Sequence, residues 1–142
     1  MRFMIIVKAT KDTEAGKFPE GEEMEKLMGD MARYHEELAK AGALVDASGL
    51  QPSSKGWRIK YGGAKRTFID GPFTESKELV AGYTIIKVKS KEEAIQWTRR
   101  FPNPAVDGKE AEIEVRQLYE LEDFGSSEAV ERFREMGVGA KR

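Results

Sequence analysis

The stretch of residues 22–41 constrains the fold most, because it is a long segment with a clear helical period. Its apolar side chains recur at spacings of three and four, which places them on one face of an α-helix. They are Met24, Leu27, Met28, Met31, Tyr34, Leu38 and Ala41. Glutamates in the first turn favour the helix dipole, and Gly42 is suited to end the helix. We therefore predict an amphipathic helix with one buried stripe.

Strand-like segments surround this helix and a second one. The second helix is predicted behind Ser90, which forms a capping-box pattern with Glu93. The segments with strand composition are 3–9, 43–50, 57–61, 66–69, 79–88 and 113–121. Gly62-Gly63 is a hairpin signal, whereas the polar residues 10–21 are predicted to be a loop. The order predicts an α+β sandwich with both helices on one sheet face and an inserted β-hairpin.

The helices would leave the other face of this sheet open. Its strands are nevertheless apolar on both faces, as in the nearly continuous apolar run of residues 3–7. Because a large exposed apolar face marks an interaction surface, we predict a homodimer in which a second subunit covers the open face. Beyond the last strand, Ser126-Ser127 can cap a short added C-terminal helix that ends at Gly137.

The composition excludes several classes of partner and site. Lysine and arginine total 24 and aspartate and glutamate total 25, so the net charge is -1, which argues against duplex DNA or an anionic membrane. The absence of cysteine excludes disulfides and thiolate metal sites and fits a cytoplasmic location. No apolar run approaches the roughly 20 residues that span a bilayer. No ligand spacing or cofactor motif is present, so we expect no metal and no cofactor.

The stretch of residues 70–78, with the sequence DGPFTESKE, crowds a turn with ionisable side chains. In a structural role, Asp70 caps the Gly-Pro turn through an Asx-type hydrogen bond. In a functional role, Asp70 is a carboxylate at a strand end that faces a pocket and acts as a general base or ligand contact. Glu75, Lys77 and Glu78 are either solvated charges or ligand-binding members of a polar cluster around Asp70.

His35 is the only histidine and lies at the margin of the apolar stripe. A histidine in that position is either packed and hydrogen-bonded within the fold or available for proton transfer. Imidazole needs a partner that fixes its tautomer, and the carboxylate of Asp70 would serve. The second alternative therefore predicts a catalytic pair of His35 and Asp70.

Aromatic and basic residues alternate on the predicted hairpin. Trp57, Arg58 and Tyr61 raise the alternative of base stacking on single-stranded nucleic acid. The same alternation is ordinary for cross-strand packing, and we interpret it in that way. We therefore predict no direct binding of nucleic acid.

The sequence DGPFTESKE at residues 70–78 resembles the signature of the DGPF proteins, a branch of the YCII-related family. Other stretches are similar to the family as well, namely 41–44, 49–53, 82–83, 90–97 and 113–116. We assign residues 1–121 to a domain of this family and residues 122–142 to a C-terminal helical extension.

The resemblance implies a ferredoxin-like fold that dimerises through its sheets as a dimeric α+β barrel. It also implies an active-site pair, a histidine on the first helix and an aspartate near the Gly-Pro turn, at positions that match His35 and Asp70. Some YCII relatives dehydrochlorinate or hydrolyse small aromatic compounds. DGPF proteins are often encoded beside extracytoplasmic-function sigma factors, which implies a regulatory role instead.

Two hypotheses for function follow from these features. The first is a small-molecule pocket near Asp70, with His35 and Asp70 transferring protons. The alternative is a non-catalytic interaction protein associated with sigma-factor-linked transcriptional regulation. Heme or oxygenase chemistry, which also occurs on this fold, is a third. The first hypothesis requires His35 and Asp70 to share a cavity, and the second requires an exposed apolar patch beyond the dimer interface.

Overall fold

The computed structural model describes residues 1–74, 78–106 and 108–139. Its elements are β1 (Arg2–Lys8), α1 (Lys11–Glu14), α2 (Glu22–Lys40), β2 (Leu44–Gly49), η1 (Ser53–Lys55), β3 (Trp57–Gly62), β4 (Lys65–Asp70), β5 (Val80–Lys87), α3 (Lys91–Arg99), β6 (Ile113–Gln117), η2 (Leu121–Phe124) and α4 (Glu128–Glu135), where η marks a 3-10 helix. An antiparallel sheet has the strand order β2-β5-β1-β6, and β3 and β4 form a separate hairpin. This topology confirms the predicted α+β, ferredoxin-like fold, with its inserted hairpin and added C-terminal helix.

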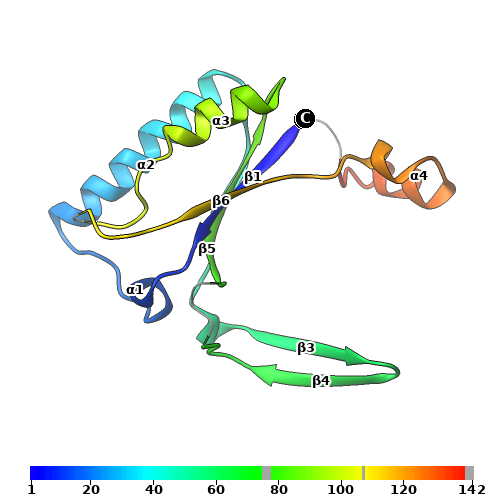
Figure 1. Ribbon diagram of the computed structural model, residues 1–142, viewed down its shortest axis with the longest axis horizontal. Coiled ribbons are helices and arrows are strands. Elements are labelled where there is room, and N and C mark those ends of the chain that lie inside the picture. Colours follow the sequence, from blue (N-terminus) through cyan, green and yellow to red (C-terminus); the bar gives the residue numbers. More distant parts are fainter. Residues whose placement is uncertain (75–77, 107, 140–142) are drawn as a thin grey trace.

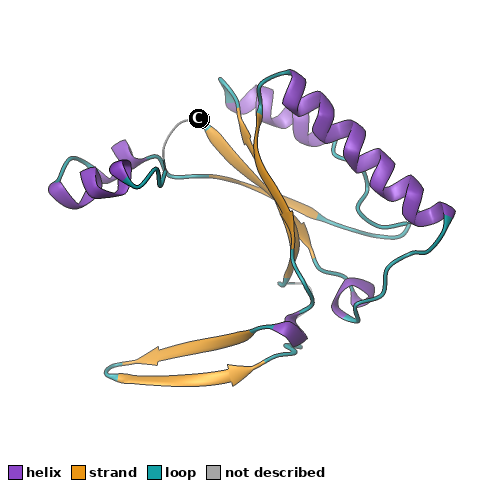
Figure 2. Ribbon diagram, turned by 180° about the vertical axis from the view of Figure 1, so that it is seen from behind, coloured by secondary structure: helices purple, strands orange, loops and turns teal. Residues whose placement is uncertain are grey.

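The molecule has one helical layer and one sheet layer. The helices α2 and α3 lie against one face of the four-stranded sheet (Figure 1). The hairpin β3–β4 and the helix α4 project on the other side, at opposite ends of the sheet, as the view from behind also shows (Figure 2). Among the described residues, the helices are too short or too polar to cross a membrane.

The core lies between this sheet and the two helices. In the register of β1 against β5, Phe3 is opposite Ile86 and Ile5 is opposite Thr84, and all four side chains are buried. Leu38 of α2 is fully buried against this cluster. Burial of an aliphatic side chain of this size contributes about 1.5–3 kcal/mol, so these few residues fix the sheet against the helices.

Tyr34 joins the two helices within the core. Its hydroxyl donates to the carbonyl oxygen of Trp97 at 2.7 Å, and its ring makes edge-on contacts with Trp97 and Phe101. Burial raises the pKa of the Tyr34 phenol to about 12, because the charged phenolate would lose its hydration there. The hydroxyl therefore stays a neutral donor and holds α3 at a fixed distance from α2.

The prediction that residues 10–21 are entirely loop is wrong, because α1 forms there. The Thr10 hydroxyl oxygen accepts from the Thr13 N–H at 3.2 Å, and the Thr13 hydroxyl oxygen accepts from the Thr10 N–H at 2.7 Å. These two bonds make a capping box in which threonine takes the place usually filled by glutamate or glutamine. This substitution hides the helix start from a search for the common pattern.

The hairpin turn is also shifted from its predicted place. Gly62 pairs with Lys65, so the two turn residues are Gly63 and Ala64 rather than Gly62 and Gly63. Gly63 adopts a φ of 62°, a left-handed conformation that glycine reaches without a steric penalty. The pairing of the strands on both sides is otherwise regular.

The root of the hairpin is held to the sandwich through Ser53. Its N–H donates to the Glu14 carboxylate at 3.0 Å, its hydroxyl donates to the same carboxylate, and its oxygen accepts from the Phe73 N–H at 3.0 Å. Gly71 passes so close that an added Cβ would lie 1.9 Å from the Ser53 carbonyl oxygen and 3.1 Å from that of Gly56. The turn after β4 therefore accepts only glycine at this position.

Replacement of this glycine tests the close approach. We expect Gly71→Ala to lower the free energy of unfolding by about 2–3 kcal/mol, because the backbone of η1 must move to admit a methyl group. Urea denaturation measures the change, and amide hydrogen exchange shows whether the loss is concentrated in β3 and β4. Gly62→Ala is the matched control, since its Cβ meets nothing within 4 Å. Equal stability of the two variants would contradict the tight fit.

Candidate functional site

His35 lies between α2 and the sheet, with both ring nitrogens occupied. Nδ1 is 2.7 Å from the Met31 carbonyl oxygen, which can only accept, so Nδ1 carries the proton. Nε2 is 2.8 Å from the hydroxyl of Thr84, which then donates to it in the neutral tautomer. The ring also makes edge-on contacts with Tyr34 and Phe101. This geometry gives His35 a role in joining the helix to the sheet.

Asp70 lies elsewhere, at the end of the hairpin. It is exposed and stands opposite Trp57 in the β3–β4 register. Among the described residues, no hydrogen bond joins His35 to Asp70, because the His35 ring bonds Met31 and Thr84 instead. Proton transfer by His35 and Asp70 stays a prediction.

The other candidate ligand-binding residues follow the hairpin. Glu78 is exposed in the turn that leads into β5. Glu75 and Lys77 lie outside the described residues. The expected polar cluster around Asp70 therefore stays a prediction as well.

A cleft of about 310 Å³ lies beside the first turns of α2, between α1 and the loop that follows α3. Its apolar wall consists of Val7, Phe18, Pro19, Leu27, Pro104, Ala105, Val106 and Ala111. Its polar wall consists of Lys8, Thr10, Asp12, Thr13, Lys17, Glu23 and Lys109. A mostly apolar cleft with a few polar groups is the usual form of a small-molecule site, and this volume fits a small ligand.

The lysines of the cleft differ in their surroundings. Lys8 forms an ion pair with Glu114 at 3.2 Å, and Lys109 forms a longer one with Asp12 at 3.6 Å between exposed side chains. Hydrogen bonds from Arg116, and then from Lys8, lower the pKa of Glu114 and keep it ionised. Exposed pairs contribute little, so the ammonium groups of Lys17 and Lys109 can turn toward an anion in the cleft.

This cleft could hardly be predicted from the sequence, because its walls come from separate segments. They are β1, α1, α2, the loop between the helices, and the loop before β6. Phe18 beside Pro19 was the available signal, since a phenylalanine is unusual in a polar loop and this one is exposed over the cleft. Within the ranges that the structure describes, no cluster of three or more histidine, aspartate or glutamate side chains could hold a metal ion.

A double-mutant cycle distinguishes the two roles of His35. His35→Phe removes both ring bonds and leaves the buried Thr84 hydroxyl unpaired, so we expect a loss of about 1–3 kcal/mol in unfolding free energy. We expect His35→Phe and Thr84→Val to be coupled by about 1 kcal/mol, because each removes the same bond. His35→Phe and Asp70→Asn should add within about 0.5 kcal/mol. Coupling to Asp70 instead would contradict the structural role.

Comparisons with known proteins identify the family of this chain. The YCII-related domain family matches residues 1–121. The chain is 28% identical over 98 residues to the uncharacterized protein R00369 of Rhizobium meliloti (strain 1021), which covers 69% of this chain and 79% of that protein.

Among solved structures, the chain is similar to 5-chloro-2-hydroxyhydroquinone dehydrochlorinase (TftG) from Burkholderia phenoliruptrix AC1100, solved in complex with 2,5-dihydroxybenzoquinone. The similarity has a TM-score of 0.41 at 12% identity and covers 84% of this chain and 95% of that chain. The reaction and the ligand belong to that protein. The match over residues 1–121 shows that the chain belongs to the YCII-related family.

Proposed function

We propose that this YCII-related protein binds a small, largely apolar molecule with an anionic group in the cleft beside α2. The observation that carries the proposal is the wall of the cleft, in which apolar side chains meet lysines from three separate segments. Apolar contact supplies the affinity, and the lysine ammonium groups select the anion. The proposed pocket thus lies away from Asp70, which is not among the residues that line it.

Benzoate and benzamide test this proposal, because they share one shape and differ in charge. We expect benzoate to shift the backbone amide NMR signals of Val7, Thr13 and Val106, with a dissociation constant in the millimolar range. Benzamide should bind several-fold more weakly, since it offers no charge to the lysines.

Two substitutions on neighbouring positions of α2 provide the control. Leu27→Trp places a larger side chain in the cleft and should abolish the benzoate shifts. Met28 is exposed and does not line the cleft, so Met28→Trp should leave the shifts unchanged. If benzoate moved signals near His35 and Asp70 and left the cleft unchanged, the first hypothesis from the sequence would replace this one.

We also propose that the protein works as a homodimer through the open sheet face. The register of β1 against β5 puts Met4, Ile6, Tyr83 and Ile85 side by side on this face, away from the helices, and β6 adds Glu114 and Arg116 at the edge of this strip. All four are only partly buried within one subunit. Burial of apolar surface stabilises an association by about 25 cal/mol for each Å² removed from water, which supports coverage of this strip by a second copy of the chain.

A charge on this strip should separate the subunits. We expect Ile6→Lys to weaken the dimer at least tenfold, because its ammonium group would have to leave water for a largely apolar interface. Sedimentation equilibrium measures the dissociation constant. Met28→Lys, on the exposed side of α2, is the control and should leave it unchanged. A wild-type chain that remains monomeric at 100 µM would contradict the homodimer.

A non-catalytic interaction role is the second candidate function. It is supported by exposed apolar side chains outside the sheet face, which gather on the hairpin and near the C-terminus. Such patches are the feature that an interaction protein requires. Binding of a macromolecule to these patches would be an activity separate from binding of benzoate to the cleft, and it requires that a second subunit does not cover the patches.

A further inference from the structure

The hairpin arm, defined as residues 57–70, exposes one aromatic face. The register places Trp57, Ile59 and Tyr61 on the same face as Phe68 and Arg66. The rings of Trp57 and Phe68 stack with centroids 6.0 Å apart, and the Arg66 guanidinium lies 5.0 Å from the Tyr61 ring. Trp57 is still 61% exposed and Tyr61 69% exposed. An isolated hairpin is marginally stable in water, so packing of this face against another surface would stabilise the arm.

The C-terminal arm, defined as residues 118–139, has a similar excess of exposed apolar surface. Its exposed apolar side chains are Tyr119, Phe124, Phe133, Met136 and Val138. Phe133 and Met136 line a shallow hollow of about 530 Å³ on α4. The helix is well capped, since the Ser127 hydroxyl accepts from the Val130 N–H at 3.1 Å. It is thus a formed helix whose apolar side is uncovered within one subunit.

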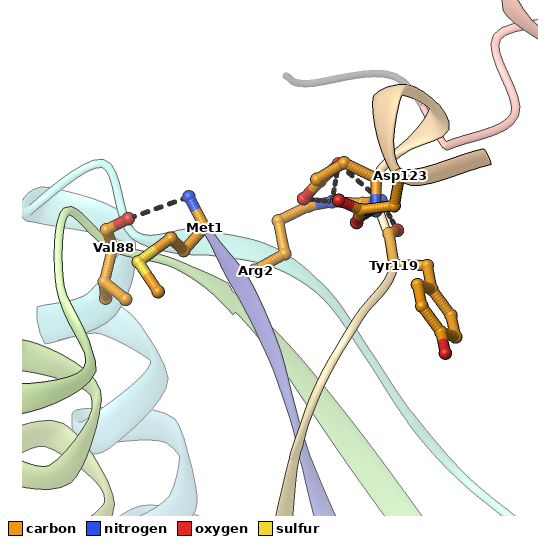
Figure 3. Close-up of polar contacts among 6 residues, drawn as sticks. Met1, Arg2, Val88, Tyr119 and Asp123 are labelled. Carbon is orange, nitrogen blue, oxygen red and sulfur yellow. Dashed lines mark hydrogen bonds and ion pairs between the residues drawn. The ribbon is translucent and has the colours of Figure 1, made fainter. Parts of the chain in front are cut away.

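Both arms are fixed at their roots. Arg2 is buried and holds the C-terminal arm by bonds from Nε and Nη2 to the Glu120 carboxylate, each at 3.0 Å, and by a bond to the Tyr119 carbonyl oxygen at 3.3 Å (Figure 3). A paired, charge-assisted contact of this kind fixes direction as well as position. Ser53 fixes the root of the hairpin arm in the same way. The arms are therefore preorganised for a contact, which lowers the entropy cost of binding.

The two arms carry opposite charge. The hairpin arm has four basic side chains and one acidic side chain, a net charge of +3. The C-terminal arm has six acidic and two basic side chains, a net charge of -4. Charges of opposite sign beside exposed aromatic groups give complementary surfaces. Figure 1 shows the arms apart from each other within one subunit, so the two surfaces can meet only between subunits.

We infer that in the homodimer the hairpin arm of each subunit packs on the C-terminal arm of its partner. This inference rests on the proposed homodimer. Both arms stand on the side of the uncovered sheet face, at opposite ends of the strands (Figures 1 and 2). A two-fold axis along that face and across the strands exchanges the two ends. Each hairpin arm then lies at the same end of the dimer as the partner's C-terminal arm, and the contact that we infer there occurs twice.

The arrangement favours this partner over a nucleic acid. The basic side chains of the hairpin arm are in part engaged with aromatic rings, since the Arg58 guanidinium lies 3.7 Å from the Phe73 ring centre. The acidic C-terminal arm on the same side of the sheet would repel phosphates. A second copy of the chain satisfies both the charge and the apolar surface of each arm.

Cross-linking tests the contact directly, because the chain contains no cysteine. Full-length Tyr61→Cys and Met136→Cys are mixed, with a tag on one of them, and treated with a short bismaleimide. We expect a cross-linked heterodimer on a denaturing gel. Tyr61→Cys mixed with Met28→Cys, which lies on the helical side, should give none. A strong product from Tyr61→Cys alone would place the hairpin arms against each other and overturn the inference.

Charge exchange gives a second, independent test. We expect Lys65→Glu with Arg66→Glu to raise the dimer dissociation constant at least tenfold at 50 mM salt. Glu128→Lys with Glu135→Lys should do the same. A mixture of the two double variants should form a heterodimer within about threefold of the wild-type dissociation constant, since opposite charges meet again.

The outcomes separate the inference from the homodimer on which it rests. A monomeric wild type would remove the homodimer and the arm contact together. A dimeric wild type whose dissociation constant is unchanged by either charge reversal would overturn the arm contact and leave the sheet-face dimer standing. Retention of the wild type on immobilised single-stranded DNA, lost on reversal of the hairpin charges with no change in dimerisation, would assign the hairpin arm to nucleic acid instead.

Discussion

The antiparallel pairing of β1 with β5 is the constraint on which the rest of the structure depends. It sets Ile5 opposite Thr84, so that an apolar side chain faces the core while a hydroxyl reaches His35 on α2. Because side chains alternate along a strand, a slip by one residue would turn the whole buried set to the open face. The same register leaves Ile6 beside Tyr83 on that open face. One pairing thus decides both the core and the surface offered to a second subunit.

The amphipathic pattern of residues 22–41 and the capping serine at position 90 predicted α2 and α3, and the strand segments predicted the sheet. These features depend on residues close in sequence, which is why the sequence reveals them. The helix α1 was missed because Thr13 takes the place of a glutamate in its cap. The partner of His35 could not be predicted, since Thr84 lies 49 residues away and reaches it only through the β1–β5 register.

The turn at residues 70–73 illustrates how a specific motif can have a structural reason. Gly71 has no room for a side chain beside Ser53, and the Phe73 N–H is bonded to the Ser53 hydroxyl oxygen. Both facts concern the attachment of the hairpin to the sandwich, and neither requires a reaction at Asp70.

The cleft beside α2 is the opposite case, a candidate site without a sequence motif. Its side chains come from five segments without any local pattern, so only the folded chain brings them together.

The contact between Arg2 and Glu120 also has a consequence for how the chain reaches its native state. These residues are 118 positions apart, so the bond cannot form until β6 has been made and has paired with β1. Contacts of such sequence separation form late, because a long loop must close first. Until then β1 keeps one edge unpaired while the aromatic side chains of the hairpin are exposed as well, and a chain with both features is the kind of intermediate that aggregates. We therefore expect this chain to aggregate most readily early in folding, before β6 pairs with β1.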